Sequence, residues 1–155
     1  MNVKTRIIKI KGDWNEVLND CRFTANKSDI DKEPSDKFKK KILIAEHSPI
    51  RDISFKWEWI NIKHWVAVHW VRHKWECFVS TQRSDRINED RDAFRQDIKQ
   101  NFRGDANIQH LIDTMRKRLC LKASYETRIC AESLKSEIHK CDRFIANVLV
   151  PNCIY

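Results

Sequence analysis

The scarcity of glycine and proline constrains the fold of this chain more than any other feature of its sequence. Only 2 of the 155 residues are glycine and 3 are proline. Because these residues mark most turns and loops, a chain with so few of them is expected to be rich in helices with short connections. The sequence contains neither G-x-G-x-x-G nor G-x-x-x-x-G-K-[ST], which excludes the glycine-rich phosphate cradles of Rossmann and P-loop proteins. Any nucleotide must therefore be held by side chains.

The length and the apolar content predict one domain that spans residues 1–155. This is an ordinary domain size, and 41% of the residues are apolar, which is enough for a real core. No apolar run is long enough to cross a membrane, and lysine and arginine interrupt the apolar part of the N-terminus, unlike in a signal peptide. We therefore expect a cytoplasmic protein that does not associate with membranes.

Six cysteines are spread along the sequence, at positions 21, 77, 120, 130, 141 and 153. None forms a C-x-x-C pair, and no histidine lies at zinc-finger spacing from a cysteine pair. The expected state is six free thiols in a reducing compartment, without a metal site.

Residue periodicity predicts a few short strands and several helices. Alternation predicts strands at Val3–Ile10, Ile53–Trp59 and Cys77–Ser80. Helical spacing predicts helices at Trp14–Thr24, after Pro34-Ser35, at Ile62–Val71, after Asn107 and at Ser124–Cys141, with Phe144–Val150 closing the chain. The apolar stripe of the second helix is expected to consist of Phe38, Ile42, Leu43 and Ile44. Residues 83–103 are so polar that we expect a surface excursion that is partly helical.

Two basic clusters are typical of a receptor for a phosphorylated ligand. The net charge of +8 favours anionic partners, although a solvated lysine-rich surface would carry the same charge. Arg72, His73 and Lys74 end an apolar helix, where cations also complement the helix dipole. Ser84 and Arg86 are two residues apart on a segment that we expect to be extended, so they would point the same way and form a good phosphate receptor.

Three further groups allow both a structural and a functional interpretation. His47 follows an apolar helix, as many ordinary surface histidines do. Arg128, with Arg118 and Lys122 upstream, either adds charge to an anion site or lies on an exposed amphipathic helix. The tryptophans at positions 57, 59, 65, 70 and 75 either form the core or stack on a flavin or a base.

Taken in order, these segments resemble three sequence blocks of the flavin-dependent thymidylate synthases, the ThyX family. The stretch R-H-K-W-E-C-F-V-S-T-Q-R-S-D-R resembles the family's Arg-His-Arg, spacer and Ser-x-Arg signature. E-H-S-P-I-R supplies the histidine that precedes the signature, and A-S-Y-E-T-R is similar to a late Ala-Gln-x-Glu-x-Arg block. The likeness covers residues 35–150 and looks closest to short members carried by bacteriophages, which would place the protein in the host cytoplasm. The departures are Lys74 for Arg, a longer spacer, and Thr81, Gln82 and Ile87 for Asn, Glu and Tyr.

The resemblance implies an α/β (α+β) fold that is helix-rich around a small antiparallel sheet and is not a Rossmann fold. It implies that dUMP is methylated to dTMP with FAD as cofactor and methylenetetrahydrofolate and NADPH as co-substrates, in a homotetramer whose active sites lie between subunits. The residues matching the family's flavin contacts are His47, Ser48, Arg72, His73, Lys74 and Asn107. Those matching its dUMP contacts are His69, Gln82, Ser84, Arg86 and Arg128, of which Arg128 would polarise the uracil ring as the catalytic residue. Lys99 and Arg103 are candidates for a phosphate-binding cation donated by a neighbouring subunit.

The residues leave two other functions open. A related flavin enzyme could modify a pyrimidine nucleotide differently, for example by hydroxymethylation, and the same arginines and histidines would serve it. A non-catalytic descendant could bind nucleotides or nucleic acid, which the tryptophans and the basic charge would suit. For the enzyme itself, nucleic acid is not an expected partner.

Overall fold

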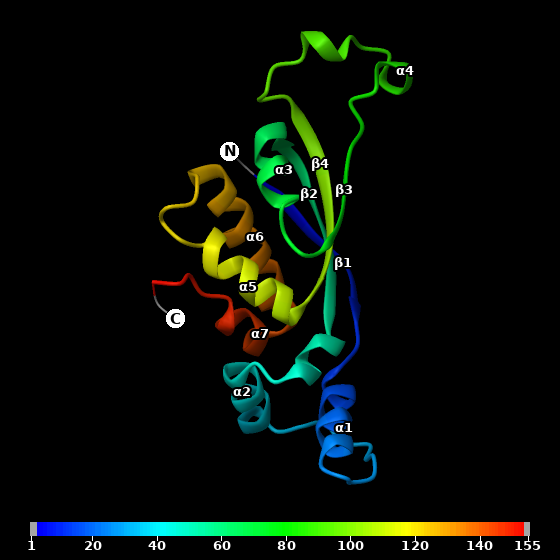
Figure 1. Ribbon diagram of the computed structural model, residues 1–155, viewed down its shortest axis with the longest axis vertical. Coiled ribbons are helices and arrows are strands. Elements are labelled where there is room, and N and C mark those ends of the chain that lie inside the picture. Colours follow the sequence, from blue (N-terminus) through cyan, green and yellow to red (C-terminus); the bar gives the residue numbers. More distant parts are fainter. Residues whose placement is uncertain (1–2, 154–155) are drawn as a thin grey trace.

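The computed structural model describes residues 3–153, which fold around one four-stranded antiparallel sheet (Figure 1). The strands occur in the order β1-β2-β4-β3 and span Lys4–Lys11 (β1), Ser54–Lys63 (β2), Glu76–Val79 (β3) and Lys99–Asn107 (β4). The α-helices span Trp14–Thr24 (α1), Asp36–Ala45 (α2), His64–Trp70 (α3), Ser84–Ile87 (α4), Ile108–Arg118 (α5), Tyr125–Cys141 (α6) and Arg143–Val148 (α7). Two 3-10 turns span Ser48–Asp52 (η1) and Arg91–Ala93 (η2). The prediction of a helix-rich α+β fold around a small antiparallel sheet is confirmed.

Tryptophans of β2 and α3 form the centre of the core. The helices α3, α5 and α6 lie on one side of the sheet (Figure 1). Successive residues of a strand face opposite sides of its sheet, and Trp57 and Trp59 of β2 are fully buried. The ring centroids of Trp59 and Trp70 are 4.6 Å apart, and those of Trp57 and Trp59 are 5.5 Å apart. These three tryptophans therefore belong to the core, as one of the two sequence interpretations held.

The inner strand β4 lies where the sequence predicted only a surface excursion, so that prediction is wrong for residues 99–103. The residues of β4 that face the core are chemically diverse, namely Gln100, Phe102, Gly104 and Ala106. The Trp57 ring fills the space beside Gly104. A Cβ at this position would lie 2.4 Å from Trp57 Cζ2, so no larger residue fits without a shift. Alternate residues of β4 are buried, but they do not form an apolar sequence pattern, and the strand was therefore not predicted.

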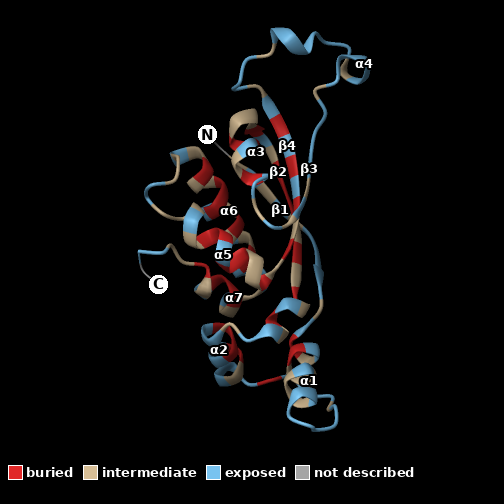
Figure 2. Cartoon of the chain, in the orientation of Figure 1, coloured by how far each residue is buried: buried red, intermediate tan, exposed pale blue. Residues whose placement is uncertain are grey.

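Residues 80–98 do form the predicted excursion, which we call the arm. The arm connects β3 to β4, carries α4 and η2, and extends beyond the end of the sheet (Figure 1). Most of its residues are exposed (Figure 2). It is therefore held mainly by its two attachments to the sheet.

Two smaller expectations are corrected. The helix expected from Ile62 begins at His64, because β2 continues to Lys63. Ile44 does not belong to the apolar stripe of α2, because it is 72% exposed whereas Ile42 and Leu43 are buried. Two residues rotate about 200° around an α-helix, which places Ile44 nearly opposite Ile42.

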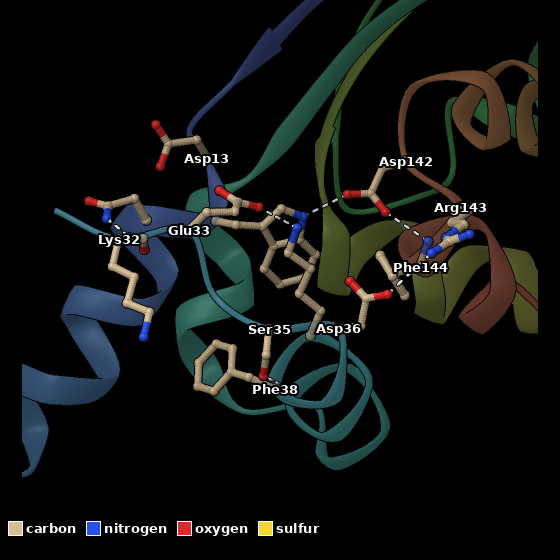
Figure 3. Close-up of polar contacts among 12 residues, drawn as sticks. Asp13, Lys32, Glu33, Ser35, Asp36, Phe38, Asp142, Arg143 and Phe144 are labelled. Atoms are coloured by element: carbon tan, nitrogen blue, oxygen red, sulfur yellow. Dashed lines mark hydrogen bonds and ion pairs between the residues drawn. The ribbon is translucent and has the colours of Figure 1, made fainter.

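A clasp of four residues, Trp14, Lys39, Asp142 and Phe144, ties the N-terminal helices to α7 (Figure 3). Trp14 Nε1 donates a hydrogen bond to Asp142 Oδ2 at 2.6 Å, and the other carboxylate oxygen of Asp142 accepts from the Phe144 backbone N–H at 2.8 Å. Lys39 is only 9% exposed, and its ammonium lies 5.3 Å from the Trp14 ring and 5.6 Å from the Phe144 ring. Glu33 forms an ion pair with this ammonium. The buried charge is therefore compensated by two aromatic faces and one carboxylate.

The six cysteines are free thiols, as predicted. Among the described residues, no helix combines the length and the apolar character needed to cross a bilayer. Residues 3–153 also contain no group of three or more His, Cys, Asp or Glu side chains placed to hold a metal ion.

Candidate functional site

A cavity of about 380 Å³ lies between the turn that follows α3 and one face of α5. The turn contributes Arg72, His73 and Lys74 to its lining. The helix contributes residues spaced by three or four, which share one side of an α-helix, namely His110, Asp113, Thr114 and Lys117. Arg116 and Asn152 complete the lining. We call this cavity the cationic pocket, because its arginines and lysines outnumber its single carboxylate, that of Asp113.

Two indole rings fix the turn that carries the predicted signature. Trp75 Nε1 donates to the Trp70 carbonyl at 2.9 Å, and the two rings stack with their centroids 5.6 Å apart. The His73 ring lies against both, 5.8 Å from Trp70 and 5.2 Å from Trp75. Arg72 and Lys74 on either side of His73 stay exposed. The turn therefore presents a fixed imidazole between two solvated cations.

Arg118 orients His73 and connects it to the preceding helix. Arg118 Nε donates to His73 Nε2 at 2.7 Å, and Arg118 Nη2 donates to the His69 carbonyl at 2.8 Å. Because His73 accepts through Nε2, its own proton must be on Nδ1. Burial, followed by the positive charges of Arg118 and Lys117, lowers the pKa of His73 to about 4. The ring is therefore neutral at pH 7 despite its cationic surroundings.

His69 is bound on its other side to α6. Its Nδ1 lies 2.9 Å from Thr127 Oγ1, and Ser124 Oγ donates to the same threonine oxygen at 2.7 Å. Burial, followed by the charges of Arg118 and Arg72, lowers the pKa of His69 below its usual value. These effects favour the neutral form of the ring, and one of them comes from Arg72, which lines the cationic pocket.

His47 and Ser48 lie in a second cavity of about 550 Å³, formed by α1, α2 and η1. Apolar side chains such as Phe38 and Ile42 make up much of its wall. Glu46, the neighbour of His47, forms an ion pair with Arg116 of the cationic pocket. The predicted histidine therefore stands next to the pocket's wall but in a separate cavity of the same chain.

The arm carries the residues predicted to bind the phosphate of dUMP. Ser84 and Arg86 are exposed and belong to the short helix α4, so the expectation of an extended segment is wrong there (Figure 2). Asn88, in the left-handed conformation, ends this helix after a single turn. Ser84 Oγ accepts from the Arg91 backbone N–H at 3.2 Å. Gln82, at the base of the arm, lines a third cavity of about 260 Å³.

Three of the remaining predicted residues, Asn107, Arg128 and Arg103, have structural partners within the chain. Asn107 caps α5, where its side chain accepts from the His110 backbone N–H at 2.9 Å. Arg128 lies 3.5 Å from the Glu132 carboxylate and 5.7 Å from the Tyr125 ring centroid, outside the lining of the cationic pocket. Of the candidates for a donated cation, Arg103 pairs with Glu58 at 3.1 Å on the outer face of the sheet, and Lys99 is exposed at the start of β4.

Sequence reasoning missed the contribution of α5 to the pocket. It used only the apolar stripe of that helix and gave Arg118 a general positive charge without a partner. The signal that could have found the pocket is the polar stripe at His110, Asp113 and Lys117, which repeats with helical spacing opposite the core. The pairing of Arg118 with His73 has no such signal, because the two residues are 45 positions apart.

Comparisons with known proteins were made by sequence and by structure. No protein-family model matches the chain, and no curated protein matches it in sequence. Two structures of the flavin-dependent thymidylate synthase ThyX from Helicobacter pylori, each with FAD and dUMP, have a TM-score of 0.78 at 11% and 12% identity. The alignments cover 95% and 96% of this chain and 99% of each ThyX chain.

A further similar structure is a UMP/dUMP methylase, PolB from Streptomyces cacaoi, bound with 5-Br dUMP. Its TM-score is 0.76 at 10% identity, with 95% of this chain and 94% of the methylase covered. At such low identity these likenesses establish the shared architecture. Over almost its whole length, the chain therefore has the fold of the flavin-dependent thymidylate synthases.

Proposed function

We propose that this protein is a flavin-dependent thymidylate synthase, which methylates dUMP to dTMP with FAD as cofactor and methylenetetrahydrofolate and NADPH as co-substrates. One observation carries the proposal: the Arg-His-Lys signature lines a cationic pocket within a fold whose similar structures are bound to FAD and dUMP. Thymidylate synthesis of this kind does not need a cysteine nucleophile. The residues of the turn and of α5 would instead bind and orient the ligands.

The residues of the cationic pocket fit part of an FAD molecule. Arg72, Lys74 and Lys117 offer exposed positive charges to a diphosphate, and His73 offers an Nδ1–H donor from a neutral ring. The cavity of about 380 Å³ is at the small end of the range for ligand pockets, roughly 300–1,000 Å³. A dinucleotide would therefore extend beyond it, and His47 and Ser48 of the second cavity are proposed as further flavin contacts.

The chain's own side chains would orient the two planar ligands and stabilise negative charge. Reduced FAD would supply the hydride for the methyl group once the folate has supplied the carbon. Arg128 is proposed to polarise the uracil ring, since a guanidinium stabilises charge that develops on a carbonyl oxygen. Arg118 keeps His73 in one tautomer and orientation, so the pocket needs little rearrangement when a ligand enters.

We propose a homotetramer whose active sites are shared between copies of the chain. Ser84 and Arg86 are on the arm, and Arg128 lies outside the lining of the cationic pocket. An arm that extends from one subunit could reach the pocket of another, where Ser84 and Arg86 would bind the nucleotide phosphate.

A second candidate is a related enzyme that modifies a uracil nucleotide differently. The similar structure of a UMP/dUMP methylase favours it, and so does the altered signature, because Lys74 lacks the bidentate geometry of an arginine. Both functions need a uracil nucleotide beside the same cationic pocket. They differ in the product.

The first experiment tests for the flavin and the nucleotide. We expect the purified protein to take up FAD, to be yellow, and to change its flavin spectrum when dUMP is added. Lys74→Ala should weaken FAD binding about tenfold, because one charged contact is lost. Lys140→Ala removes a charge from the exposed end of α6, outside the pocket, and should leave FAD binding unchanged. A colourless protein that takes up no added FAD would exclude both enzymatic functions.

The second experiment identifies the product. Rescue of a thymidine-requiring bacterium, together with dTMP found by mass spectrometry after reaction with dUMP, methylenetetrahydrofolate and NADPH, is the expected outcome. A hydroxymethylated product, or methylation of UMP without rescue, would instead assign the second candidate.

A further inference from the structure

The contact between α3 and α6 contains a hydroxyl that has no access to water. Thr127 is 0% exposed, whereas Ser124 and His69 are half-buried. The threonine oxygen lies 2.7 Å from Ser124 Oγ and 2.9 Å from His69 Nδ1. These two atoms are its only side-chain partners within residues 3–153. The single hydroxyl proton of Thr127 must therefore go to one of them.

The chemistry of the two acceptors decides the direction of the chain of hydrogen bonds. An unprotonated imidazole nitrogen is basic and accepts more strongly than a hydroxyl oxygen. Ser124 Oγ donates to Thr127 Oγ1 at 2.7 Å, so the hydroxyl proton of Thr127 is left for the nitrogen of His69. The order is then Ser124 to Thr127 to His69 Nδ1, which leaves the ring proton of His69 on Nε2.

We propose that Thr127 is a positioning residue that holds His69 as the Nε2–H tautomer, so that the ring offers a uracil nucleotide one hydrogen-bond donor and no acceptor. This inference rests on the proposed function for the identity of the ligand. Within the described part of the chain, Nε2 of His69 has no hydrogen-bond partner, so its proton is not taken up by another residue there.

A donor with no acceptor distinguishes between pyrimidines. Uracil carries a carbonyl oxygen at position 4, which accepts a hydrogen bond, whereas cytosine carries an amino group there, which donates. A fixed Nε2–H would pair with the oxygen and be left unpaired by the amino group. Sites that rely on such a hydrogen bond reject the analogue that cannot make it. We therefore expect His69 to favour dUMP over dCMP.

The tautomer is measured directly in the protein labelled with ¹⁵N-histidine. In long-range ¹H–¹⁵N correlation spectra, the expected wild-type result is an unprotonated Nδ1 and a protonated Nε2 for His69, assigned by its loss in His69→Gln. Thr127→Val, which keeps the shape but removes the hydroxyl, should give a mixture of tautomers. Thr127→Ser restores the hydroxyl and should restore the Nε2–H form.

Binding of dUMP and dCMP to the FAD-loaded protein gives the functional result. Thr127→Val should weaken dUMP binding about tenfold and reduce the preference for dUMP over dCMP by the same factor. His69→Gln can turn either its amide N–H or its carbonyl oxygen toward the base, so it should bind dUMP more weakly than the wild type and favour it less over dCMP. His69→Asn places its amide too close to the backbone and should resemble Thr127→Val.

Thr5→Val is the matched control. It also removes a threonine hydroxyl that bonds to α6, since Thr5 Oγ1 lies 2.5 Å from Ser133 Oγ. It should lower thermal stability without changing the His69 tautomer or the nucleotide preference. An Nδ1–H tautomer in the wild type, or an unchanged spectrum in Thr127→Val, would overturn the inference. The proposed function would still stand in that case if the protein binds dUMP. A wild-type protein that binds no dUMP would overturn the recognition role of His69 together with the proposed function.

Discussion

At the scale of single residues, two arginines of similar sequence position have very different surroundings. Arg118 is half-buried and donates to His73 and to the backbone of His69. Arg128 is paired only loosely with Glu132 on α6. The first therefore supports the architecture of the cationic pocket, and the second is available for a ligand that approaches α6.

Alanine substitutions at these two positions should have separate effects. Arg118→Ala removes the donor that orients His73, so we expect FAD binding to weaken about 10- to 30-fold. Arg128→Ala should keep FAD binding but lose the spectral response to dUMP, because the proposed contact is with the uracil ring. Titrations of both variants with FAD and then with dUMP test this. Equal FAD affinity in Arg118→Ala and wild type would contradict the role given to Arg118.

Asp52 gives the molecule a measurable dependence on pH. Burial, together with a hydrogen bond to Asp20 and the charges of Asp20 and Glu16, raises the pKa of Asp52 to about 6 from 3.8. The folded state thus retains a proton that the unfolded chain releases between pH 3.8 and 6. The stability that this proton contributes is complete below pH 3.8 and is lost as the pH rises through 6.

Asp52→Asn should therefore stabilise the protein above pH 6 and have little effect below pH 4. We expect about 1 kcal/mol at pH 8, a value reduced for solvent screening at this half-exposed site. Thermal unfolding at pH 4, 6 and 8 measures the effect. Asp31→Asn, in the exposed loop between α1 and α2, should show no such trend. A lower melting temperature for Asp52→Asn at pH 8 would refute the argument.

At the scale of elements, sequence periodicity found the helices better than the sheet. The helix α1 begins and ends where its cap and stripe predicted, since Asp13 accepts from the Glu16 backbone N–H at 2.9 Å. The strand β4 could not be found, because its core-facing residues include Gln100 and Gly104. Gln100 is buried only because it bonds to His64 at 2.6 Å and to the Ser80 carbonyl at 3.0 Å. Such partners are invisible in a local pattern.

The candidate site was likewise only partly predictable. The three consecutive residues Arg72–Lys74 meet in one pocket because they share a single turn. His47 and Ser84 do not join them, because their positions depend on η1 and on the arm, which the sequence blocks do not orient. Contiguous residues could thus be placed from sequence, whereas contacts between distant elements could not.

The contact of Gly104 with Trp57 makes β4 sensitive to one methyl group. Gly104→Ala would place a Cβ 2.4 Å from Trp57 Cζ2, so we expect a loss of about 1–3 kcal/mol in unfolding free energy. Urea unfolding measures this, with Lys99→Ala at the exposed start of β4 as control. Trp57→Phe removes the clashing atoms, so Gly104→Ala should cost less in that background than in the wild type. Equal costs in both backgrounds would count against the clash.

At the scale of the whole molecule, the clasp links the stability of the helices α1 and α2 to that of α7. Lys39→Ala removes the ammonium that lies between the Trp14 and Phe144 rings, and we expect a loss of about 1–2 kcal/mol. Lys40→Ala changes the same charge at the exposed neighbouring position. Comparison of the two melting temperatures is the test, and a shift as large in Lys40→Ala would show that only the charge of α2 matters.

The same clasp delays the folding of α1 and α2 during synthesis of the chain. Trp14 is 128 positions ahead of its partner Asp142 in the sequence, so it leaves the ribosome long before Asp142 is available. Domains usually gain structure from the N-terminus during synthesis. Here the Trp14 indole and the Lys39 ammonium have no α7 partners until residues 142 to 144 have been synthesised. A ribosome that stalls before residue 142 should therefore hold a nascent chain that is open to proteases and chaperones at its N-terminal end.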